Sequence, residues 1–272
     1  MNQQYFGLIQ AQGDDAQQFL QGQLSCDLQE VSTEQFRLGA HCNPQGRMLS
    51  SFYLFSWNQC YYFLLPRSMV DLTLQGFKTY LLFSRCEMTD VTNQFHIALL
   101  ESSGQPPETA TSNEQQCQLQ ISPSEAIQIS TDSTETGLTA NQWQFQEIAR
   151  GHTWVLPETS GKHLPQAFNY DFLNGVSFTK GCYTGQEVIA RMHYKGKMKQ
   201  RLYCFQSSQQ PVVGQSITSD TEQKVGEVVS YIGTSKGHEL LAVVRHDRAA
   251  EPLFIGDKQP LTALNLDTYH HY

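Results

Sequence analysis

The stretch TKGCYTGQEVIAR, residues 179–191, brings together residue types that can do chemistry. Cys182 becomes a nucleophile and a metal ligand once its thiol loses the proton, and Lys180 supplies a positive charge two positions earlier. Gly181 and Gly185 permit tight turns or a close approach of another group to the backbone. The stretch therefore predicts a thiol that is either reactive or packed in a tight turn.

A helix is expected directly after this thiol. Thr184 and Glu187 match the S/T-x-x-E pattern of a capping box, which predicts Thr184 as the N-cap of a helix over residues 185–194. Cys182 would then lie two residues outside the helix, where the partial positive charge of the helix end favours the thiolate. These residues alone leave two interpretations open, a reactive cysteine and a buried structural one.

Other motifs for catalysis or metal binding are missing. The sequence has no G-x-S-x-G, no Walker A, no G-x-G-x-x-G and no H-E-x-x-H pattern. Its seven cysteines are odd in number and form no C-x-x-C pair, which argues against a disulfide framework, a zinc site and a self-contained iron–sulfur site. Most of these thiols are expected to be small buried apolar residues.

The charge of the chain is acidic, with one local exception. A formal net charge of −8 disfavours direct nucleic-acid binding. No acid occurs from residue 188 through residue 219, and a basic run lies in this interval. A solvated surface is the favoured interpretation of the run; contact with an anion such as a polyglutamate tail, a phosphate or RNA is the alternative. The run consists of Arg191, Lys195, Lys197, Lys199 and Arg201.

The first part of the chain has the pattern of an α+β unit. Strands are predicted at 6–13, 47–57, 60–66 and 86–92, where β-branched and aromatic residues cluster between turn signals. Apolar residues at helical spacing predict a helix over residues 70–81. Hairpins that feed a helix are typical of the α+β class.

The second part changes character twice. Residues 101–116 are polar and rich in Pro, Ser and Thr, and predict a surface loop or a shortened connection. Short strands follow at 118–130, and a helix is predicted over 140–151. After about residue 200 all predicted elements are strands, at the spacing of a small barrel that would form a second domain.

A cytoplasmic location without membrane contact is expected. No apolar run reaches the about 18 residues that a membrane span needs. The first residues, MNQQYFGLIQAQGDD, lack the basic and apolar regions of a signal peptide.

The segment KGCYTGQEVIAR resembles the signature of the YgfZ family, folate-binding proteins related to the T-protein (aminomethyltransferase) of glycine cleavage. The similarity spans most of the chain and is weakest over residues 100–140. It includes the segments QGDDAQQFLQGQLSCDL, HCNPQGRML, LPQAFNYDFLNGVSF and VGEVVS.

This resemblance implies a fold. It is an α+β, T-protein-like folate-binding fold with three lobes around a central channel, one of them ferredoxin-like, and a C-terminal β-barrel. Residues 1–195 would form the folate-binding body, with a short variable segment near 100–140, and residues 196–272 the barrel domain. Both expectations agree with the pattern of strands and helices.

The resemblance also implies site residues. Trp143 stands where the family places an aromatic residue before the helix that precedes the motif, and Tyr5 or Phe6 is its counterpart in the first strand. A pterin ring favours aromatic walls with a few polar contacts at its edge. Cys182 and Lys180 are expected to carry redox, sulfur or partner chemistry. The matching motif is Lys180, Gly181, Cys182, Tyr183, Thr184, Gly185, Gln186 and Glu187, and the expected folate contacts are Tyr5, Phe6, Trp143, Arg150, Tyr183, Gln186 and Glu187.

One departure from the T-proteins bears on catalysis. They carry a pair of acids after the glycine turn of the hairpin, and this chain has Ser50 and Ser51 there. A serine hydroxyl supplies neither the charge of a carboxylate nor a base near neutral pH. Aminomethyltransferase chemistry is therefore not expected.

The predicted function is that of a non-catalytic maintenance factor. It would bind tetrahydrofolate or a one-carbon derivative and support the assembly or repair of iron–sulfur enzymes, and thereby tRNA modification, with iron–sulfur client or assembly proteins as partners. Two alternatives remain: a folate-dependent one-carbon transferase, and a binding module in which Cys182 only packs.

Overall fold

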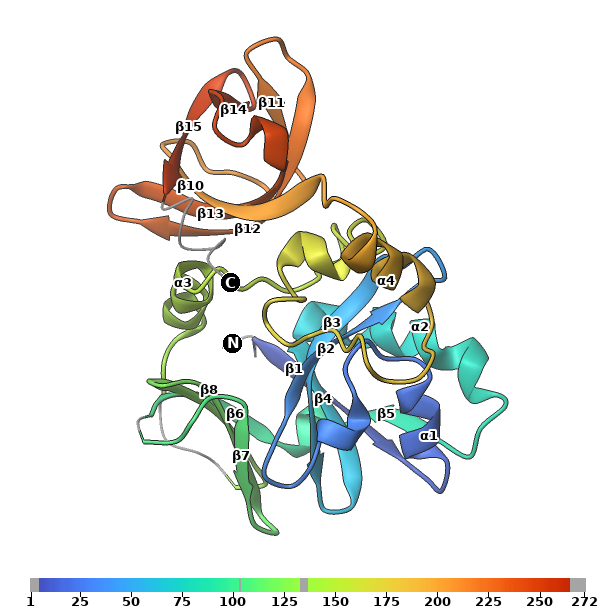
Figure 1. Ribbon diagram of the computed structural model, residues 1–272. Helices are drawn as coiled ribbons and strands as arrows, with labels where there is room; N and C mark the ends of the chain where they lie inside the picture. The colour runs from blue at the N-terminus through green and yellow to red at the C-terminus, as the bar shows by residue number, and fades with distance from the viewer. Residues whose placement is uncertain (1–4, 103, 133–136, 265–272) are drawn as a thin grey trace.

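A computed structural model of the protein describes residues 5–102, 104–132 and 137–264. It contains two open sheets and a closed barrel (Figure 1). The barrel stands at one end of the molecule. Helices α3 (Ala140–Ala149) and α4 (Gln186–Tyr194) lie between the barrel and the open sheets.

The first sheet is ferredoxin-like, as predicted. Its five strands follow the order β2-β3-β4-β1-β5 and all pairs are antiparallel. Without β2, the chain order β1-α1-β3-β4-α2-β5 gives the βαββαβ pattern of that lobe, and β2 extends one edge. The elements are β1 (Phe6–Gln12), α1 (Ala16–Gln21), β2 (Arg37–Cys42), β3 (Met48–Trp57), β4 (Cys60–Pro66), α2 (Val70–Leu81) and β5 (Glu87–Asp90).

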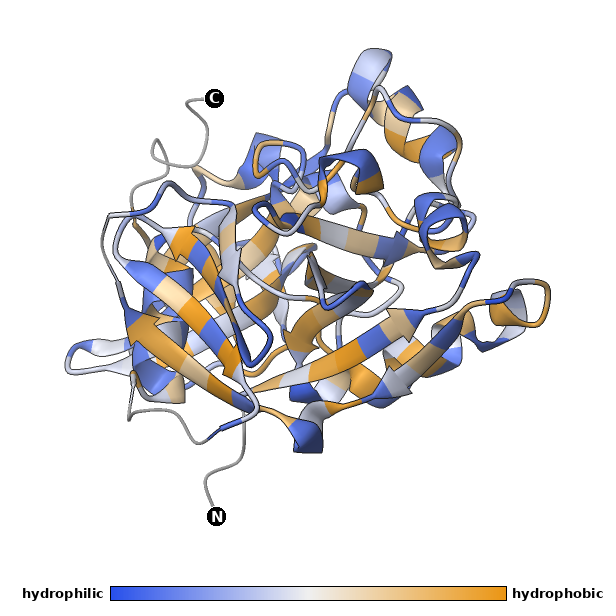
Figure 2. Ribbon diagram, turned by 90° about the horizontal axis from the view of Figure 1, so that it is seen from below, coloured by the Kyte–Doolittle hydropathy of each residue, from blue (hydrophilic) through white to orange (hydrophobic). Residues whose placement is uncertain are grey.

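Apolar periodicity explains how this lobe packs. The predicted helix over 70–81 is confirmed as α2, which buries Val70 and Phe77 against the sheet. Strand β3 is buried over nearly its whole length, because other elements cover both of its faces. Figure 2 shows the orange, hydrophobic residues concentrated along the strands.

The second sheet corrects the prediction for residues 101–116. This segment was expected to be a surface loop, yet β7 lies within it and pairs with β8 from Thr109↔Gln120 to Ser112↔Cys117. Strand β7 is a short polar strand at the edge of the sheet with one buried residue, Ala110, so no apolar alternation announces it. The sheet order is β6-β9-β8-β7, with β6 (His96–Glu101), β7 (Thr109–Ser112), β8 (Gln116–Ser122) and β9 (Glu125–Ser130).

Helix α3 begins at a capping box that sequence analysis did not identify. The Thr139 hydroxyl accepts a hydrogen bond from the backbone N–H of Gln142, and the Gln142 side chain bonds back to the Thr139 N–H. Trp143 therefore lies inside α3 and not before it, which corrects the position expected from the resemblance. As predicted, the helix closes at Gly151, whose φ is +67°.

The predicted barrel is confirmed. Its six strands follow the order β10-β13-β12-β11-β14-β15, and the last of them was not predicted. The domain limits 1–195 and 196–272 stay a prediction. The strands are β10 (Gln200–Ser207), β11 (Ser216–Ser219), β12 (Lys224–Thr234), β13 (Gly237–Arg245), β14 (Leu253–Ile255) and β15 (Gln259–Leu264).

Short 3-10 helices lie in several connections of the described chain. They are η1 (Leu28–Glu30), η2 (Arg67–Met69), η3 (Thr92–Gln94), η4 (Pro165–Phe168) and η5 (His246–Arg248). Among the described residues, no helix has both the length and the apolar character to cross a membrane.

A buried ion pair joins the first barrel strand to the segment around η4. The Arg201 guanidinium donates to both carboxylate oxygens of Asp171, at 2.7 and 2.9 Å, and to the Gln166 carbonyl at 2.6 Å. The two charged side chains are only 15% and 6% exposed. Each needs the other, since an unpaired charge at this depth is strongly unfavourable.

We expect Arg201→Ala to lower the free energy of unfolding by about 3 kcal/mol, because Asp171 would remain buried without its partner. Urea denaturation followed by circular dichroism measures the change. Arg245→Ala is the matched control: Arg245 makes the same two-bond pair with Asp247, but both groups are exposed, so its removal leaves the stability nearly unchanged. Equal losses in the two variants would contradict this account.

Candidate functional site

A buried carboxylate lies where α3 meets the first strand. Glu147 is 2% exposed and accepts three hydrogen bonds. The Tyr5 hydroxyl donates to Oε2 at 2.7 Å, and the indole N–H groups of Trp143 and Trp154 donate to Oε1 at 2.9 and 2.6 Å. These donors come from the residue just before β1, from α3 itself and from the segment after α3, so the carboxylate connects three parts of the chain.

Burial is the largest cause of the pKa shifts of Glu147 and His152 in this cluster. Burial raises the pKa of Glu147, while the three donors and the nearby charge of Arg150 oppose the shift. Burial, aided by Arg150, lowers the pKa of His152 to about 3. His152 is therefore neutral at physiological pH, and its Nδ1, 3.8 Å from Glu147 Oε1, forms no ion pair with the carboxylate.

Aromatic rings surround the carboxylate. Phe6 meets the Trp154 ring edge-on at a centroid distance of 5.6 Å and the Trp143 ring at 6.4 Å. Trp154 also contacts Tyr53 and His152, at 4.9 and 4.5 Å. Such edge-to-face contacts fix the ring orientations. The polar atoms of the cluster are therefore held in a rigid apolar frame.

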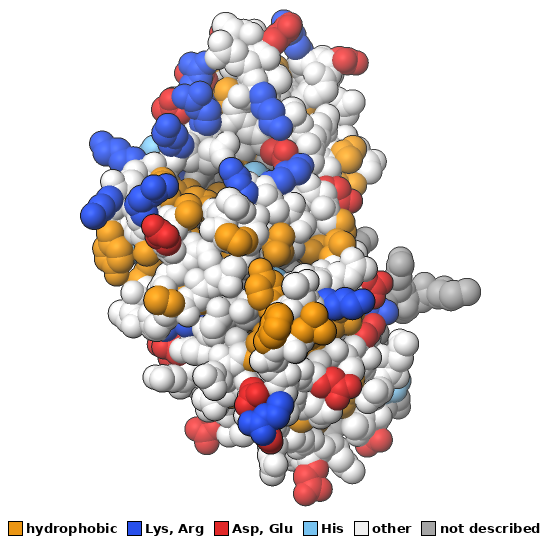
Figure 3. All heavy atoms as spheres, turned by 90° about the vertical axis from the view of Figure 1, so that its right-hand side faces the viewer, with side chains coloured by type: hydrophobic (Ala, Val, Ile, Leu, Met, Phe, Trp, Pro, Cys, Tyr) orange, Lys and Arg blue, Asp and Glu red, His pale blue; other side chains and the backbone are white. Residues whose placement is uncertain are grey.

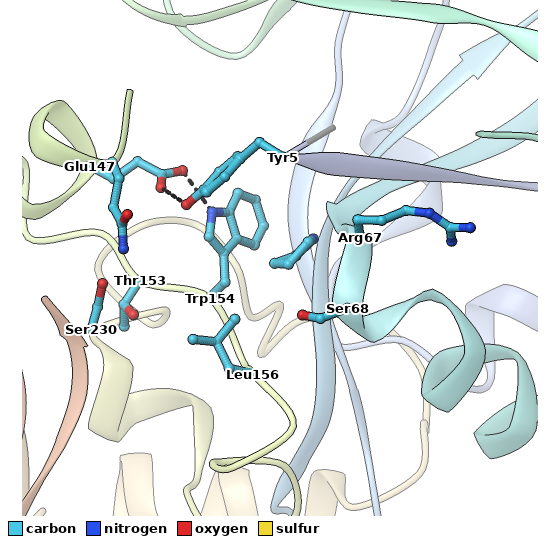
Figure 4. Close-up of a pocket in the computed structure, with 10 residues that line it drawn as sticks. Tyr5, Arg67, Ser68, Glu147, Thr153, Trp154, Leu156 and Ser230 are labelled. Carbon is cyan, nitrogen blue, oxygen red and sulfur yellow. Dashed lines mark hydrogen bonds between the residues drawn. The ribbon is translucent and has the colours of Figure 1, made fainter. Parts of the chain in front are cut away.

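A hollow of about 420 Å³ opens beside Glu147. Figure 4 shows the Glu147 carboxylate and the Tyr5 hydroxyl facing one another, with Trp154 next to them. The Arg67 guanidinium points away from the carboxylate and pairs with Asp90 at 3.0 Å. The lining comes from the first sheet, α3, the segment after it and the barrel: Tyr5, Pro66, Arg67, Ser68, Gln144, Glu147, Thr153, Trp154, Leu156 and Ser230.

Two further hollows, of about 630 and 130 Å³, share Arg150 as a lining residue. The Arg150 guanidinium lies 5.6 Å from the centroid of the Trp143 ring and pairs with the buried carboxylate of Glu125. Tyr53 and His152 line the smaller hollow. Because both rings also contact Trp154, the aromatic cluster separates these hollows from the one beside Glu147.

The hollow beside Glu147 suits a flat aromatic ligand with N–H groups on one edge. A carboxylate offers about four acceptor sites, and protein donors fill three of those on Glu147. One site is left, on Oε2, and Glu147 lines the hollow together with the apolar walls that Tyr5, Trp154 and Leu156 provide.

The motif over 180–187 lies against other elements. The Lys180 ammonium is turned inward, where it donates to the carbonyls of Leu24 and Cys26 at 2.9 and 2.7 Å. Its Nζ also lies 5.2 Å from the centroid of the Tyr183 ring. Burial lowers the pKa of Lys180 to about 8. The lysine thus holds the motif on the segment that follows α1.

The predicted capping box at Thr184 and Glu187 is wrong. Helix α4 begins at Gln186 with Gly185 as N-cap, and no side chain caps it. The Thr184 hydroxyl bonds Gln23 Oε1 at 3.2 Å instead, while Glu187 is exposed. The sequence pattern fits a cap, but the tertiary contact with Gln23 takes the hydroxyl.

Gly185 is required by a close contact. Its φ is +84°, and a Cβ at this position would lie 2.5 Å from the Asn43 carbonyl oxygen and 2.9 Å from the Cα of Gly46. The motif therefore presses on the turn of the hairpin between β2 and β3. Gly181 differs, because no atom lies within 4 Å of the place that its Cβ would take.

Cys182 is exposed between these anchored residues, while Cys26, Cys42, Cys86, Cys117 and Cys204 are buried and Cys60 is half-buried. The expectation that most thiols are buried is thus confirmed, and Cys182 is not a buried packing residue. It precedes α4 at a greater distance than predicted, since the helix begins at Gln186. Among the described residues, no three His, Cys, Asp or Glu side chains are grouped to hold a metal ion.

The expected folate contacts divide into two groups. Tyr5, Phe6, Trp143 and Arg150 meet around Glu147. The others, Tyr183, Gln186 and Glu187, belong to the motif and line none of the three hollows just described.

Sequence analysis missed two residues of the site, Glu147 and Trp154. The spacing of Trp143 and Glu147, four positions apart on one helix, was the available signal, because it places both on the same helical face. Trp154 gave no such signal, since it lies in an irregular segment.

The two serines of β3 are fully buried. Ser51 Oγ accepts a hydrogen bond from the Val155 N–H at 2.9 Å, so it positions the segment that carries Trp154. Ser50 points to the opposite face of the strand, and its hydroxyl has no hydrogen-bond partner among the described residues. Neither supplies a carboxylate.

Comparison with known proteins gives close and distant similarities. The chain is 31% identical over 232 residues to tRNA-modifying protein YgfZ of Vibrio atlanticus (strain LGP32), covering 79% of this chain and 72% of that protein. The protein of the same name from Vibrio vulnificus (strain YJ016) is 30% identical over 284 residues, covering 96% and 85%. No protein-family model matches the chain.

A solved structure extends the similarity to the fold. Glycine cleavage system aminomethyltransferase T from Bartonella henselae superimposes with a TM-score of 0.70, over 96% of this chain and 83% of that chain. The sequences are only 12% identical, so this likeness concerns the fold alone. The expected T-protein-like architecture is confirmed.

We expect Gly185→Ala to lower the free energy of unfolding by at least about 2 kcal/mol, because the alanine would adopt a strained backbone and press on the hairpin turn. Gly181→Ala is the matched control within the motif and should leave stability unchanged. Thermal denaturation of both variants measures the difference. An unchanged free energy of unfolding in Gly185→Ala would show that the motif does not press on the turn of the hairpin.

Proposed function

Since the chain belongs to the YgfZ family, we propose that it binds tetrahydrofolate or a one-carbon derivative in the hollow beside Glu147. In the cytoplasm, this binding would support the assembly or repair of iron–sulfur enzymes and thereby tRNA modification. The observation that carries the proposal is a buried carboxylate with one free acceptor site in an aromatic-walled hollow.

The chemistry of a pterin matches this hollow. The pterin of tetrahydrofolate keeps a flat pyrimidinone ring, whose amide N–H and amino group lie on one edge. Glu147 would accept from that edge, and Tyr5 and Trp154 would contact the faces of the ring. Because the three protein donors already hold the carboxylate in place, binding requires little reorganisation of the site.

We propose binding without group transfer. Ser50 and Ser51 stand where T-proteins carry acids, and both hydroxyls are buried. When bound, the folate would supply a one-carbon carrier, and the residues around Glu147 would hold and shield it. The relatives are named tRNA-modifying proteins, and that name motivates the link to tRNA.

Cys182 would act separately from the folate hollow. The motif anchors its neighbours Lys180 and Gly185 on the body, while the thiol faces solvent. A rigidly presented, exposed thiol is accessible to another protein, and an iron–sulfur client or assembly protein is the partner class that we propose.

Folate binding is tested by titrating the protein with tetrahydrofolate, followed by calorimetry and by the fluorescence of Trp143 and Trp154. Tyr5→Ala removes one wall and one donor to Glu147, so we expect binding at least about tenfold weaker than that of the wild type. Tyr80→Ala, at an exposed tyrosine of α2, is the matched control and should bind like the wild type. Absence of saturable binding by the wild type would refute the proposed site.

The role of Cys182 is tested in cells that lack the endogenous protein. Cys182→Ala should fail to restore iron–sulfur enzyme activity, because the partner loses the exposed thiol, yet it should bind tetrahydrofolate normally. Cys60→Ala, which changes the half-buried thiol of β4, should restore activity. Full restoration by Cys182→Ala would remove the thiol from the function.

A further inference from the structure

A positively charged surface lies where α4 approaches the barrel, on a protein whose net charge is −8. Figure 3 shows Lys and Arg side chains gathered in the upper half of this view, while Asp and Glu predominate in the lower half. We call this surface the basic face. It comprises Arg191, Lys195, Lys197, Lys199 and Arg245.

A hollow of about 620 Å³ lies on the basic face. It is lined by the link between α4 and β10 and by the end of β13. The two segments are fixed to one another, because the His246 N–H donates to the Lys199 carbonyl at 2.9 Å and Gln200 pairs with Arg245 across the strands. The lining residues are Lys197, Met198, Lys199, Gln200, Arg245, His246 and Asp247.

The charges of the link are available to a ligand. Lys195, Lys197 and Lys199 are exposed, and no carboxylate among the described residues lies within ion-pair distance of their ammonium groups. The single acid of the hollow, Asp247, is paired with Arg245 at 2.6 Å. Three cations therefore face solvent without local compensation.

One residue of the basic run does not belong to the basic face. Arg201 was grouped with the lysines in the sequence, but its guanidinium is turned inward to Asp171 and lies 4.5 Å from the centroid of the Phe172 ring. The face thus consists of the lysines before β10, with Arg191 and Arg245 at its sides.

Stabilisation of α4 does not account for these lysines. Cations in the last turn of a helix interact favourably with its dipole, and Arg191 occupies that turn. Lys197 and Lys199 lie beyond the last residue of α4, Tyr194, and the effect fades within one turn.

An exposed aromatic ring stands beside the lysines. Tyr194 is 65% exposed at the end of α4, although a ring of this size usually packs. It is held at its edge by His193, at a centroid distance of 4.8 Å, and His193 in turn stacks on Phe178 at 3.7 Å. A supported, exposed ring next to cations is the arrangement on which proteins stack unpaired bases.

We propose that the basic face binds RNA directly. Lys195, Lys197 and Lys199 contact backbone phosphates, and Tyr194 stacks on an unpaired base. The choice of RNA among polyanions rests on the proposed role in tRNA modification. The exposed lysines and the exposed ring are observed independently of that role. Sequence analysis disfavoured nucleic-acid binding from the net charge, but binding depends on the local surface potential rather than on the total charge.

The test is fluorescence anisotropy of a labelled tRNA transcript titrated with the full-length protein at several salt concentrations. The variant Lys197→Gln/Lys199→Gln should bind about tenfold more weakly at low salt, and its slope of log K against log salt should be shallower by about 1.4–1.8, because two phosphate contacts are lost. Tyr194→Ala should weaken binding to single-stranded RNA about fivefold.

The matched control is Lys78→Gln/Lys236→Gln, which removes two exposed lysines from α2 and from the β12–β13 turn and changes the net charge equally. It should bind tRNA like the wild type. No binding by the wild type at low salt would overturn the proposal, as would equal weakening of both double variants. Binding to phosphatidylserine vesicles in place of tRNA would overturn it in favour of a membrane surface.

Tetrahydrofolate titration of the same variants separates this inference from the proposed function. The lysines lie outside the hollow beside Glu147, so both double variants should bind tetrahydrofolate like the wild type. Folate binding without RNA binding would overturn only the proposal that the basic face binds RNA. RNA binding without folate binding would support that proposal and overturn the proposed folate site.

Discussion

The need to hydrogen-bond one buried carboxylate organises the centre of this protein. An ionised group that is removed from water is strongly unfavourable unless donors replace the lost solvent. Glu147 obtains those donors from the start of the first sheet, from α3 and from the segment after α3, through Tyr5, Trp143 and Trp154. Each donor is itself a large ring, so the same residues that satisfy the charge also build the apolar frame around it. The core and the candidate site are therefore one structure.

The motif follows the same principle with the opposite charge. The Lys180 ammonium is buried against two backbone carbonyls, and Gly185 allows the chain to press on the hairpin turn. Most of the motif thus holds a tight segment in place, and Cys182 is exposed to solvent within that segment. The thiol and the carboxylate occupy different regions, which allows a ligand site and a partner site on one body.

The sequence predicted the elements whose signals are local. Helix α2, the ferredoxin-like strands and the barrel all have apolar periodicity or regular turn spacing, and the resemblance placed them in the correct fold. It did not predict contacts that depend on distant partners. Thr184 matches a capping pattern but bonds Gln23, and β7 is polar because it lies at an edge. In the sequence, Glu147 has the pattern of an ordinary surface residue. Its role depends on the hydrogen bond from Trp154, which lies outside the helix.

The hollow beside Glu147 has a wall from the barrel, since Ser230 of β12 contributes to it. A ligand bound there would contact both the body and the barrel, and it would stabilise the arrangement that it binds. Lys197 and Lys199 lie on the link that joins the same two units. The hollow beside Glu147 and the basic face are therefore both built where the barrel joins the body, and one junction supports them both.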